Sequence, residues 1–350
     1  MPTLPPPPDS SFASDNAAGV VPEVMEALAA ANEGPALAYG DDPWTRAADA
    51  AMRDLFDVEV AVTWCWGGTG ANVVALASVL QPWQAVIAPA SAHIVVDEAG
   101  APTRFTGAST LPVPAVDGKL TVEAVVPYLD WLGTEHHPQP RVLSISQTTE
   151  SGTVYTVDEI AELAAFAHGH GLVVHVDGAR IANAVAASGR SLPEMIRDTG
   201  VDALTFGFTK NGGVFGEAVV LLRPDLAPHA RYVRKQAGQL VSKSRFVGAQ
   251  IQALLADDLW LRNARQANEM AARLAGLVVA SDQVELVRPP EANAVMARIP
   301  WGRLDELQSW SFFWPWDPAD SQVRWMTGFA TAPADVDAFA AGVAAILAQV

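Results

Sequence analysis

Lys210 and Asp177 have the side chains, and the positions along the chain, that imine chemistry needs. Lys210 follows the run LTFGFT and opens a glycine turn, and Asp177 directly follows the apolar run LVVHV. A lysine whose pKa is lowered by burial or by a nearby cation forms an imine with an aldehyde, and a carboxylate keeps a pyridine nitrogen protonated. Aspartate and lysine at the ends of neighbouring strands therefore suggest a pyridoxal-phosphate site.

The segment WGGTGAN, residues 66–72, is suited to holding the phosphate of that cofactor. It joins a predicted strand to a predicted helix, so the backbone N–H groups of Gly68 and Thr69, the Thr69 hydroxyl and the helix N-terminus can face a phosphate dianion. Thr209, beside Lys210, offers another hydroxyl. The segment is neither a Walker nor a dinucleotide fingerprint, because it has no G-K-[ST] and no G-x-G-x-x-G.

Three further side chains are candidates for the same site. His93 lies just beyond a predicted strand, where an imidazole could stack on the cofactor ring and act as an acid or base. Arg180 lies one helical turn after Asp177, and Arg324 lies in a predicted strand near the C-terminus. The planar guanidinium of arginine suits a substrate carboxylate. These residues predict an amino acid as the substrate.

Simpler roles for these residues stay open from the sequence alone. Asp177 could cap the helix that begins at DGARIANAVA, and Lys210 could form an ion pair across a cleft. His93 could be a partly buried histidine with its hydrogen bonds satisfied. Arg324 could form an interdomain salt bridge. The chemical interpretation depends on these residues meeting in one place.

The composition restricts the classes of partner. The chain has 350 residues, half of them hydrophobic, and a formal net charge of −17, which disfavours nucleic acid and anionic membranes as partners. No apolar run reaches the roughly 18 residues of a membrane helix. Cys65 is the single cysteine, so an intrachain disulfide and a cysteine-based zinc site are excluded and no metal is expected. We expect a cytoplasmic protein without a signal peptide.

Strands and helices alternate over most of the chain, which predicts an α/β fold with a mostly parallel sheet covered by helices on both faces. Ligands in such sheets bind beyond the carboxyl ends of the strands, where the candidate residues lie. A helix is predicted over residues 157–171. The predicted strands span residues 59–64, 84–89, 141–146, 172–180, 202–208 and 217–222.

The predicted domain organisation has three parts. Residues 1–15, rich in proline, form a flexible N-terminal arm, and residues 16–245 form the large cofactor-binding domain. Residues 246–350 form a smaller α+β domain. It is expected to contain a long helical stretch from about 245 to 280, three short strands (QVELV, NAVMARIP and VRWMTGF) and a closing helix.

Eight segments, in order, resemble the threonine aldolases of the β-eliminating lyase group. They are SDNAAGVVPEVMEALAAAN, YGDDPWT, GGTGANVVAL, AHIVVDEAGAP, TTESGTVYT, HVDGARIANA, FGFTKNGG and VRWMTGFATAPADVDAF. The resemblance runs from about residue 12 to the end of the chain, and TKNGG is similar to the bacterial low-specificity branch. It implies the seven-stranded fold type I of pyridoxal-phosphate enzymes and retro-aldol cleavage of β-hydroxy-α-amino acids to glycine and an aldehyde.

The resemblance also implies roles for individual residues. Lys210 would be the Schiff-base lysine, Asp177 the partner of the pyridine nitrogen, and His93 the side chain stacked on the ring. Gly68 and Thr69 would bind the phosphate. Arg180 would contact the cofactor or the substrate carboxylate, and Ser14 and Arg324 would hold that carboxylate. A cation at Lys243 or Arg245 would reach the phosphate, of the same or of a neighbouring subunit. Tyr39 would lie near the site at a subunit boundary. A homodimer or homotetramer with shared active sites is implied.

The chain departs from the family pattern in three places. Many relatives have a histidine near the β-hydroxyl group where this chain has Thr149 or Glu150. A bulky Phe208 replaces the usual small residue before Lys210, and the segment SWSFFWPWDP is unusually aromatic. These departures concern substrate size and stereochemistry. Two alternative functions are a pyridoxal-phosphate lyase that acts by β-elimination and a non-catalytic α/β binding protein.

Overall fold

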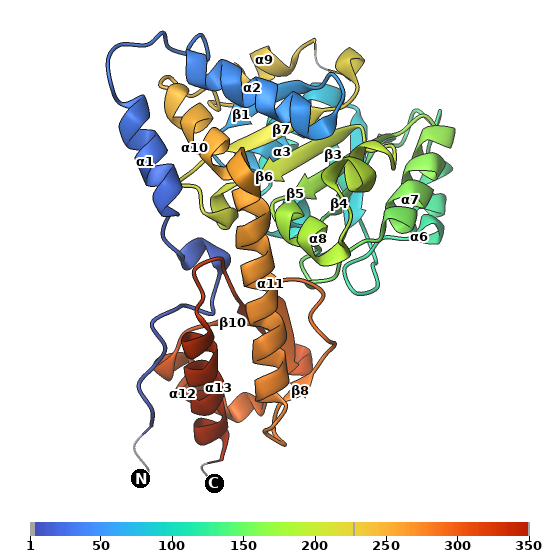
Figure 1. Ribbon diagram of the computed structural model, residues 1–350. Coiled ribbons are helices and arrows are strands. Elements are labelled where there is room, and N and C mark those ends of the chain that lie inside the picture. Colours follow the sequence, from blue (N-terminus) through green and yellow to red (C-terminus); the bar gives the residue numbers. More distant parts are fainter. Residues whose placement is uncertain (1–3, 227, 349–350) are drawn as a thin grey trace.

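A seven-stranded sheet forms the centre of the larger part of the molecule, within residues 4–226 and 228–348, which the computed structural model describes (Figure 1). The strand order is β1-β7-β6-β5-β4-β2-β3, and β7 is antiparallel to both of its neighbours while the other pairs are parallel. The predicted mostly parallel sheet is confirmed. Its strands are β1 Ala61–Cys65, β2 Gln84–Pro89, β3 Ser109–Val113, β4 Gln139–Ser146, β5 Val173–Gly178, β6 Ala203–Gly207 and β7 Glu217–Leu221.

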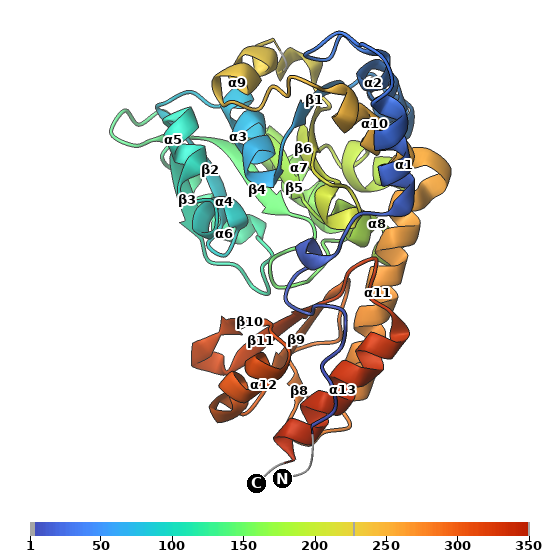
Figure 2. The ribbon, with the colours of Figure 1, turned by 90° about the vertical axis from the view of Figure 1, so that its left-hand side faces the viewer.

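Continuous apolar strands supply two cores, one on each face of this sheet. In β5, Val174 and Val176 belong to the core beneath α7 and α8, whereas Val173 belongs to the core beneath α3. The same alternation places His175 and Asp177 on the α3 face. Figures 1 and 2 show helices on both faces. The helices of this part are α1 Pro22–Ala31, α2 Pro43–Phe56, α3 Gly68–Val79, α4 His93–Val96, α5 Ala101–Thr106, α6 Val122–Leu129, α7 Val157–Gly169, α8 Ile181–Ser188, α9 Ala230–Gln236 and α10 Arg245–Leu255.

A smaller α+β unit packs below the large sheet, as predicted (Figure 2). Its antiparallel sheet has the order β10-β11-β9-β8. Phe12 stacks on Phe339 of α13, and Ser10 donates a hydrogen bond to Asp335, so the N-terminal segment lies along this unit. The elements are α11 Leu259–Val278, β8 Glu285–Leu286, β9 Ala294–Arg298, α12 Leu304–Trp310, β10 Trp314–Asp317, β11 Gln322–Met326 and α13 Pro333–Leu347.

The helical stretch predicted from about 245 to 280 is two helices. Asp257 and Asp258 have φ values of 50° and 55°, and this left-handed pair separates α10 from α11. Aspartate tolerates that conformation better than most residues. The boundaries proposed at residues 15 and 245 stay predictions. No helix in the described ranges has both the length and the apolar character that a membrane crossing requires.

The end of β6 brings Lys210 to the sheet edge and turns Phe208 away from it. Phe208 is fully buried and stacks on Phe206 at 4.3 Å between ring centroids, in the core opposite α3. Gly207 is required there, because a Cβ atom would lie 2.4 Å from the carbonyl oxygen of Ala179. This close approach brings the segment carrying Lys210 beside the turn that follows Asp177. The bulk of Phe208 therefore fills the core.

Replacing Phe208 by alanine should destabilise the protein without reshaping the substrate site. Removing a fully buried phenyl ring leaves a cavity beside Phe206, and the expected loss in free energy of unfolding is about 3–5 kcal/mol. Chemical denaturation measures it. Phe208→Leu, which keeps much of the volume, should lose less. A loss below about 1 kcal/mol for the alanine variant would contradict this packing role.

Candidate active site

Two adjoining cavities lie at the carboxyl edge of the parallel strands. The outer cavity has a volume of about 140 Å³ and the inner cavity about 270 Å³. Both are lined by Asn16, His93, Asp177, Ala179 and Lys210, so these residues form the boundary between them. The structure thus brings together the lysine, aspartate and histidine that the sequence singled out from three different strand ends.

Asp177, at the end of β5, is held by two hydrogen bonds. Its Oδ2 accepts from Nδ2 of Asn72 at 2.7 Å, and its Oδ1 accepts from the backbone N–H of Ala179 at 3.0 Å. The side chain does not cap α8, whose N-cap is Arg180. The Asn72 amide also donates to Oε1 of Glu98 at 2.9 Å. Asp177 is therefore a buried carboxylate in fixed orientation beside the inner cavity.

Lys210 lies in a short 3-10 turn, Thr209–Asn211, directly after β6. The positive charge of Arg180 lowers the pKa of Lys210, burial lowers it further, and Asp15, Asp177 and Glu217 oppose the shift. A lowered pKa increases the neutral fraction of the amine, which is the nucleophilic form. The surroundings therefore favour imine formation at Nζ.

Arg180 is held by Asp15, which the sequence analysis did not identify. Nε and Nη2 of Arg180 donate to the two carboxylate oxygens at 2.6 and 2.9 Å, and Asn293 donates to the same carboxylate at 3.1 Å. Burial raises the pKa of Asp15, but the charge and hydrogen bonds of Arg180 and the charge of Lys210 outweigh it and lower that pKa to about 2. This bidentate pair fixes the wall of the outer cavity.

Arg324, on β11 of the smaller unit, faces the outer cavity together with Ser14. Its guanidinium lies 4.4 Å from the ring centroid of Trp316, and its Nε is buried without a hydrogen-bond partner. Burial, and then the charge of Arg180, lowers the pKa of Arg324 to about 10. No salt bridge of Arg324 is found within residues 4–226 and 228–348. A partly buried cation without an ion partner is suited to binding an anion.

The inner cavity has groups suited to a phosphate and a ring. Gly68 and Thr69 lie at the N-terminus of α3, and a Cβ atom at Gly68 would meet nothing within 4 Å, so its backbone borders open space. Thr209 lines the same cavity. Burial raises the pKa of both Glu98 and Glu217 to about 7. Protonation of these carboxyl groups reduces repulsion of a bound dianion.

His93 lies at the start of α4, where it lines both cavities. Its Nδ1 is 3.2 Å from Oδ2 of Asp97, and burial, followed by the charge of Lys210, lowers its pKa. A neutral imidazole can lie against a ring without the cost of burying a charge. The geometry is compatible with the predicted stacking role.

Three predicted residues lie away from these cavities. The Tyr39 side chain is half exposed, with Nζ of Lys235 5.2 Å from its ring centroid, and Arg245 donates to the carbonyl oxygen of Gly34 at 2.8 Å. Neither these two nor Lys243 lines the outer or the inner cavity in the part of the chain that the structure describes. The predicted role of Tyr39 at a subunit boundary and that of Lys243 or Arg245 at the phosphate stay predictions.

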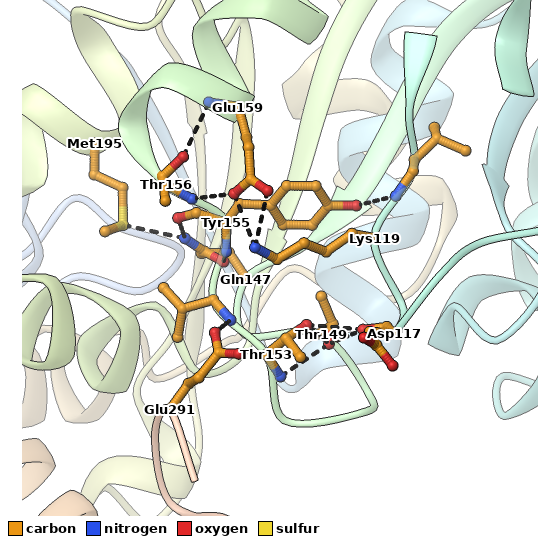
Figure 3. Close-up of polar contacts among 12 residues, drawn as sticks. Asp117, Lys119, Gln147, Thr149, Thr153, Tyr155, Thr156, Glu159, Met195 and Glu291 are labelled. Atoms are coloured by element: carbon orange, nitrogen blue, oxygen red, sulfur yellow. Dashed lines mark hydrogen bonds and ion pairs between the residues drawn. The ribbon is translucent and has the colours of Figure 1, made fainter. Parts of the chain in front are cut away.

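Thr149 and Glu150, both in the loop after β4, have different surroundings. The Thr149 hydroxyl forms a hydrogen bond of 2.7 Å with the Thr153 hydroxyl inside the loop, as Figure 3 shows. Glu150 lines the outer cavity. Of the two residues that the sequence analysis named in place of the family histidine, Glu150 is therefore the one that lines the cavity.

Several functional residues escaped the sequence analysis because their partners are distant in the chain. The position of Asn72, one helical turn after Gly68, could have identified it as a residue near the phosphate turn. Trp316 was named only as part of the segment SWSFFWPWDP. The cavity-lining residues that were missed include Asn16, Asn72, Asp97, Glu98, Glu217 and Trp316. Asp15 was also missed, and it holds the cavity-lining Arg180.

Comparisons with known proteins show the family to which the chain is similar. The family model described as Beta-eliminating lyase matches residues 11–300. The low specificity L-threonine aldolase of Pseudomonas aeruginosa is 42% identical over 305 residues, covering 86% of this chain and 88% of that protein. That of a Pseudomonas species is 40% identical, covering 89% and 94%. The solved structure of Leishmania major threonine aldolase is 31% identical with a TM-score of 0.91, covering 97% and 99%.

Replacing Asp15 by asparagine should leave Arg180 buried without its counter-ion. We expect the free energy of unfolding at pH 7 to fall by about 3–5 kcal/mol. The pair contributes fully above the ordinary aspartate pKa of about 4, and its contribution is lost as the pH falls through about 2. Denaturation at pH 7 therefore measures it in full.

The exposed pair Arg273–Asp337 is a matched control, because it has the same bidentate geometry with both side chains nearly half exposed. Asp337→Asn should cost less than about 1 kcal/mol. Equal losses for the two variants would contradict the special role of the Asp15–Arg180 pair.

Proposed function

We propose that this chain, which belongs to the β-eliminating lyase family, cleaves β-hydroxy-α-amino acids to glycine and an aldehyde with pyridoxal 5'-phosphate as its cofactor. The observation that carries the proposal is the meeting of Lys210 and Asp177 at the boundary of two cavities, with Arg324 in the outer one. The threonine aldolase names of the similar proteins support threonine as a substrate. From threonine the products would be glycine and acetaldehyde.

The inner cavity would hold the cofactor. Lys210 would attach it covalently, Asp177 would keep the pyridine nitrogen protonated, and His93 would lie on the ring. Gly68 and Thr69, with Thr209, would bind the phosphate. The bound cofactor supplies an electron sink for the bond that breaks at Cα.

The outer cavity would hold the amino acid. Arg324 presents a buried guanidinium whose Nε has no partner, and Ser14 lines the same space. Arg180 uses Nε and Nη2 for Asp15, so its Nη1 is the nitrogen outside that pair. Holding the carboxylate at these groups would fix the orientation of the Cα–Cβ bond of the substrate in the outer cavity.

The second candidate reaction is β-elimination, because the same lysine, aspartate and phosphate loop would serve it. Elimination releases ammonia and a 2-oxo acid, whereas retro-aldol cleavage releases glycine and an aldehyde. The buried carboxyl group of Glu150 in the outer cavity favours cleavage, since retro-aldol chemistry needs a group that removes the hydroxyl proton.

We further propose that the protein is a homodimer or homotetramer in the cytoplasm. Tyr39, Lys243 and Arg245 lie outside the cavities of their own chain, which fits the expectation that they act at a boundary in a homodimer or homotetramer. The single buried Cys65 fits a cytoplasmic, reducing environment.

Adding pyridoxal phosphate to the purified protein should produce a visible absorbance band, and Lys210→Ala should remove it. Lys235→Ala, an exposed lysine, should keep the band. The loaded protein should convert threonine, allo-threonine or phenylserine to glycine and the matching aldehyde. Ammonia with a 2-oxo acid in place of glycine would establish elimination, and a colourless protein would refute the cofactor assignment.

Replacing Trp316 by leucine should weaken substrate binding more than it slows turnover. The ring stabilises the Arg324 cation in its buried position, and a cation–π contact contributes about 0.5–2 kcal/mol. The KM for threonine should therefore rise about 2- to 30-fold, with kcat changed less than KM. Trp314→Leu removes a neighbouring, exposed tryptophan and is the control. An unchanged KM in Trp316→Leu would contradict this role.

A further inference from the structure

Glu150 lines the outer cavity, and one of its two carboxylate oxygens has no hydrogen-bond partner among the residues that the structure describes. Its Oε1 accepts from the backbone N–H of His93 at 2.9 Å and from the Ser146 hydroxyl at 2.7 Å. Its Oε2 is buried and has no hydrogen-bond partner. A buried acceptor without a partner is costly, so a native site that keeps one usually serves a ligand or a reaction.

The other acidic groups around the outer cavity are already occupied. Asp177 accepts from Asn72 and Ala179, and Asp97 pairs with Nδ1 of His93. Within residues 4–226 and 228–348, the buried carboxylate oxygens without a partner belong to Glu98 and Glu150, and Glu98 lines the inner cavity. Of these two residues, Glu150 is therefore the one that lines the cavity of the proposed substrate.

The loop that carries Glu150 is fixed by hydrogen bonds on both sides. The backbone N–H of Gln147 donates to the carbonyl oxygen of Asp177 at 2.8 Å, and the Gln147 side chain bonds the N–H and C=O of Tyr155 at 3.0 and 2.9 Å. Thr149 and Thr153 close the turn between them (Figure 3). Because both ends of the loop are held, Glu150 has a defined position relative to Asp177.

We propose that Glu150 is the general base that takes the proton of the substrate's β-hydroxyl group, an inference that rests on the cleavage reaction proposed above. Its Oε2 is the atom that receives the proton, while Oε1 keeps the hydrogen bonds from Ser146 and His93. His93, the candidate base from the sequence, then serves the ring of the cofactor. Glu150 occupies the role for which many relatives use a histidine.

The basicity of Glu150 agrees with this assignment. Burial raises its pKa, the negative charge of Asp177 adds to the rise, and the hydrogen bonds from Ser146 and the backbone of His93 partly oppose it. A carboxylate with a raised pKa is a stronger base than an ordinary surface glutamate. The neighbouring Arg324 and Arg180 cations favour its ionised form.

The proposed step balances without an oxidant or reductant. The O–H bond of the β-hydroxyl breaks and its proton passes to Oε2 of Glu150, while the electrons of that bond form the C=O double bond of the aldehyde. The Cα–Cβ bond breaks, and its electron pair passes to Cα, where the bound cofactor delocalises it. A proton then adds to Cα to give glycine, and Glu150 returns its proton to solvent.

Glu150→Gln in the full, cofactor-loaded protein tests the assignment. Glutamine keeps an oxygen that can accept from Ser146 and His93, so the fold and the cofactor absorbance should be unchanged. Two rates are compared, namely threonine cleavage and exchange of the glycine α-proton in D₂O followed by NMR. Exchange involves no β-hydroxyl. We expect cleavage to fall by about 10²–10⁴-fold and exchange by less than about 3-fold.

The ratio of the two losses decides the outcome. A loss of cleavage about ten or more times larger than the loss of exchange supports the assignment, and a smaller ratio overturns it. Glu150→Asp, which keeps a carboxylate, should cleave faster than Glu150→Gln. Glu162→Gln, a surface variant on α7, should match the wild type in both rates. A wild type that exchanges glycine but cleaves none of threonine, allo-threonine and phenylserine would instead refute the proposed function.

Discussion

The buried ion pair between Asp15 and Arg180 is the contact on which the site depends. Removing both charges from water costs several kcal/mol per ion, and only good geometry with further hydrogen bonds compensates for that cost. Both conditions hold here, since the pair is bidentate and Asn293 also donates to Asp15. The pair joins the N-terminal segment, the end of β5 and the smaller unit around the outer cavity. The same two charges act in opposite directions on the pKa of Lys210.

The electrostatics of the site follow from burial more than from the total charge. The chain has a net charge of −17, yet both proposed ligands are anionic at their binding ends. Burial raises the pKa of Glu98 and Glu217 to about 7, which reduces negative charge beside the proposed phosphate position. Arg324 and Arg180 supply positive charge in the outer cavity. The outer cavity therefore carries positive charge, and the inner cavity carries less negative charge than its carboxyl groups would otherwise give, although the protein as a whole is acidic.

The sequence predicts those parts of the site that follow strand ends. The sheet, the glycine turn, His93, Asp177, Arg180 and Lys210 were accessible because apolar runs and the residues after them are local signals. Asp15 contacts Arg180 across 165 residues, and Asn72 contacts Asp177 across 105, so no local pattern reveals them. The short strands β3 and β10 contain proline and were missed, since proline is usually confined to sheet edges.

Two departures from the family pattern, Phe208 and the aromatic segment SWSFFWPWDP, differ in where their side chains lie. Leu204, Phe206 and Phe208 belong to one core face, so the ring of Phe208 points away from the cofactor even though Lys210 follows two residues later. Trp316 lines the outer cavity under Arg324. Of the two departures, the aromatic segment is therefore the one that reaches the proposed substrate cavity. The side chain of the substrate would lie between that segment and the loop carrying Glu150, where the Cα–Cβ bond is broken.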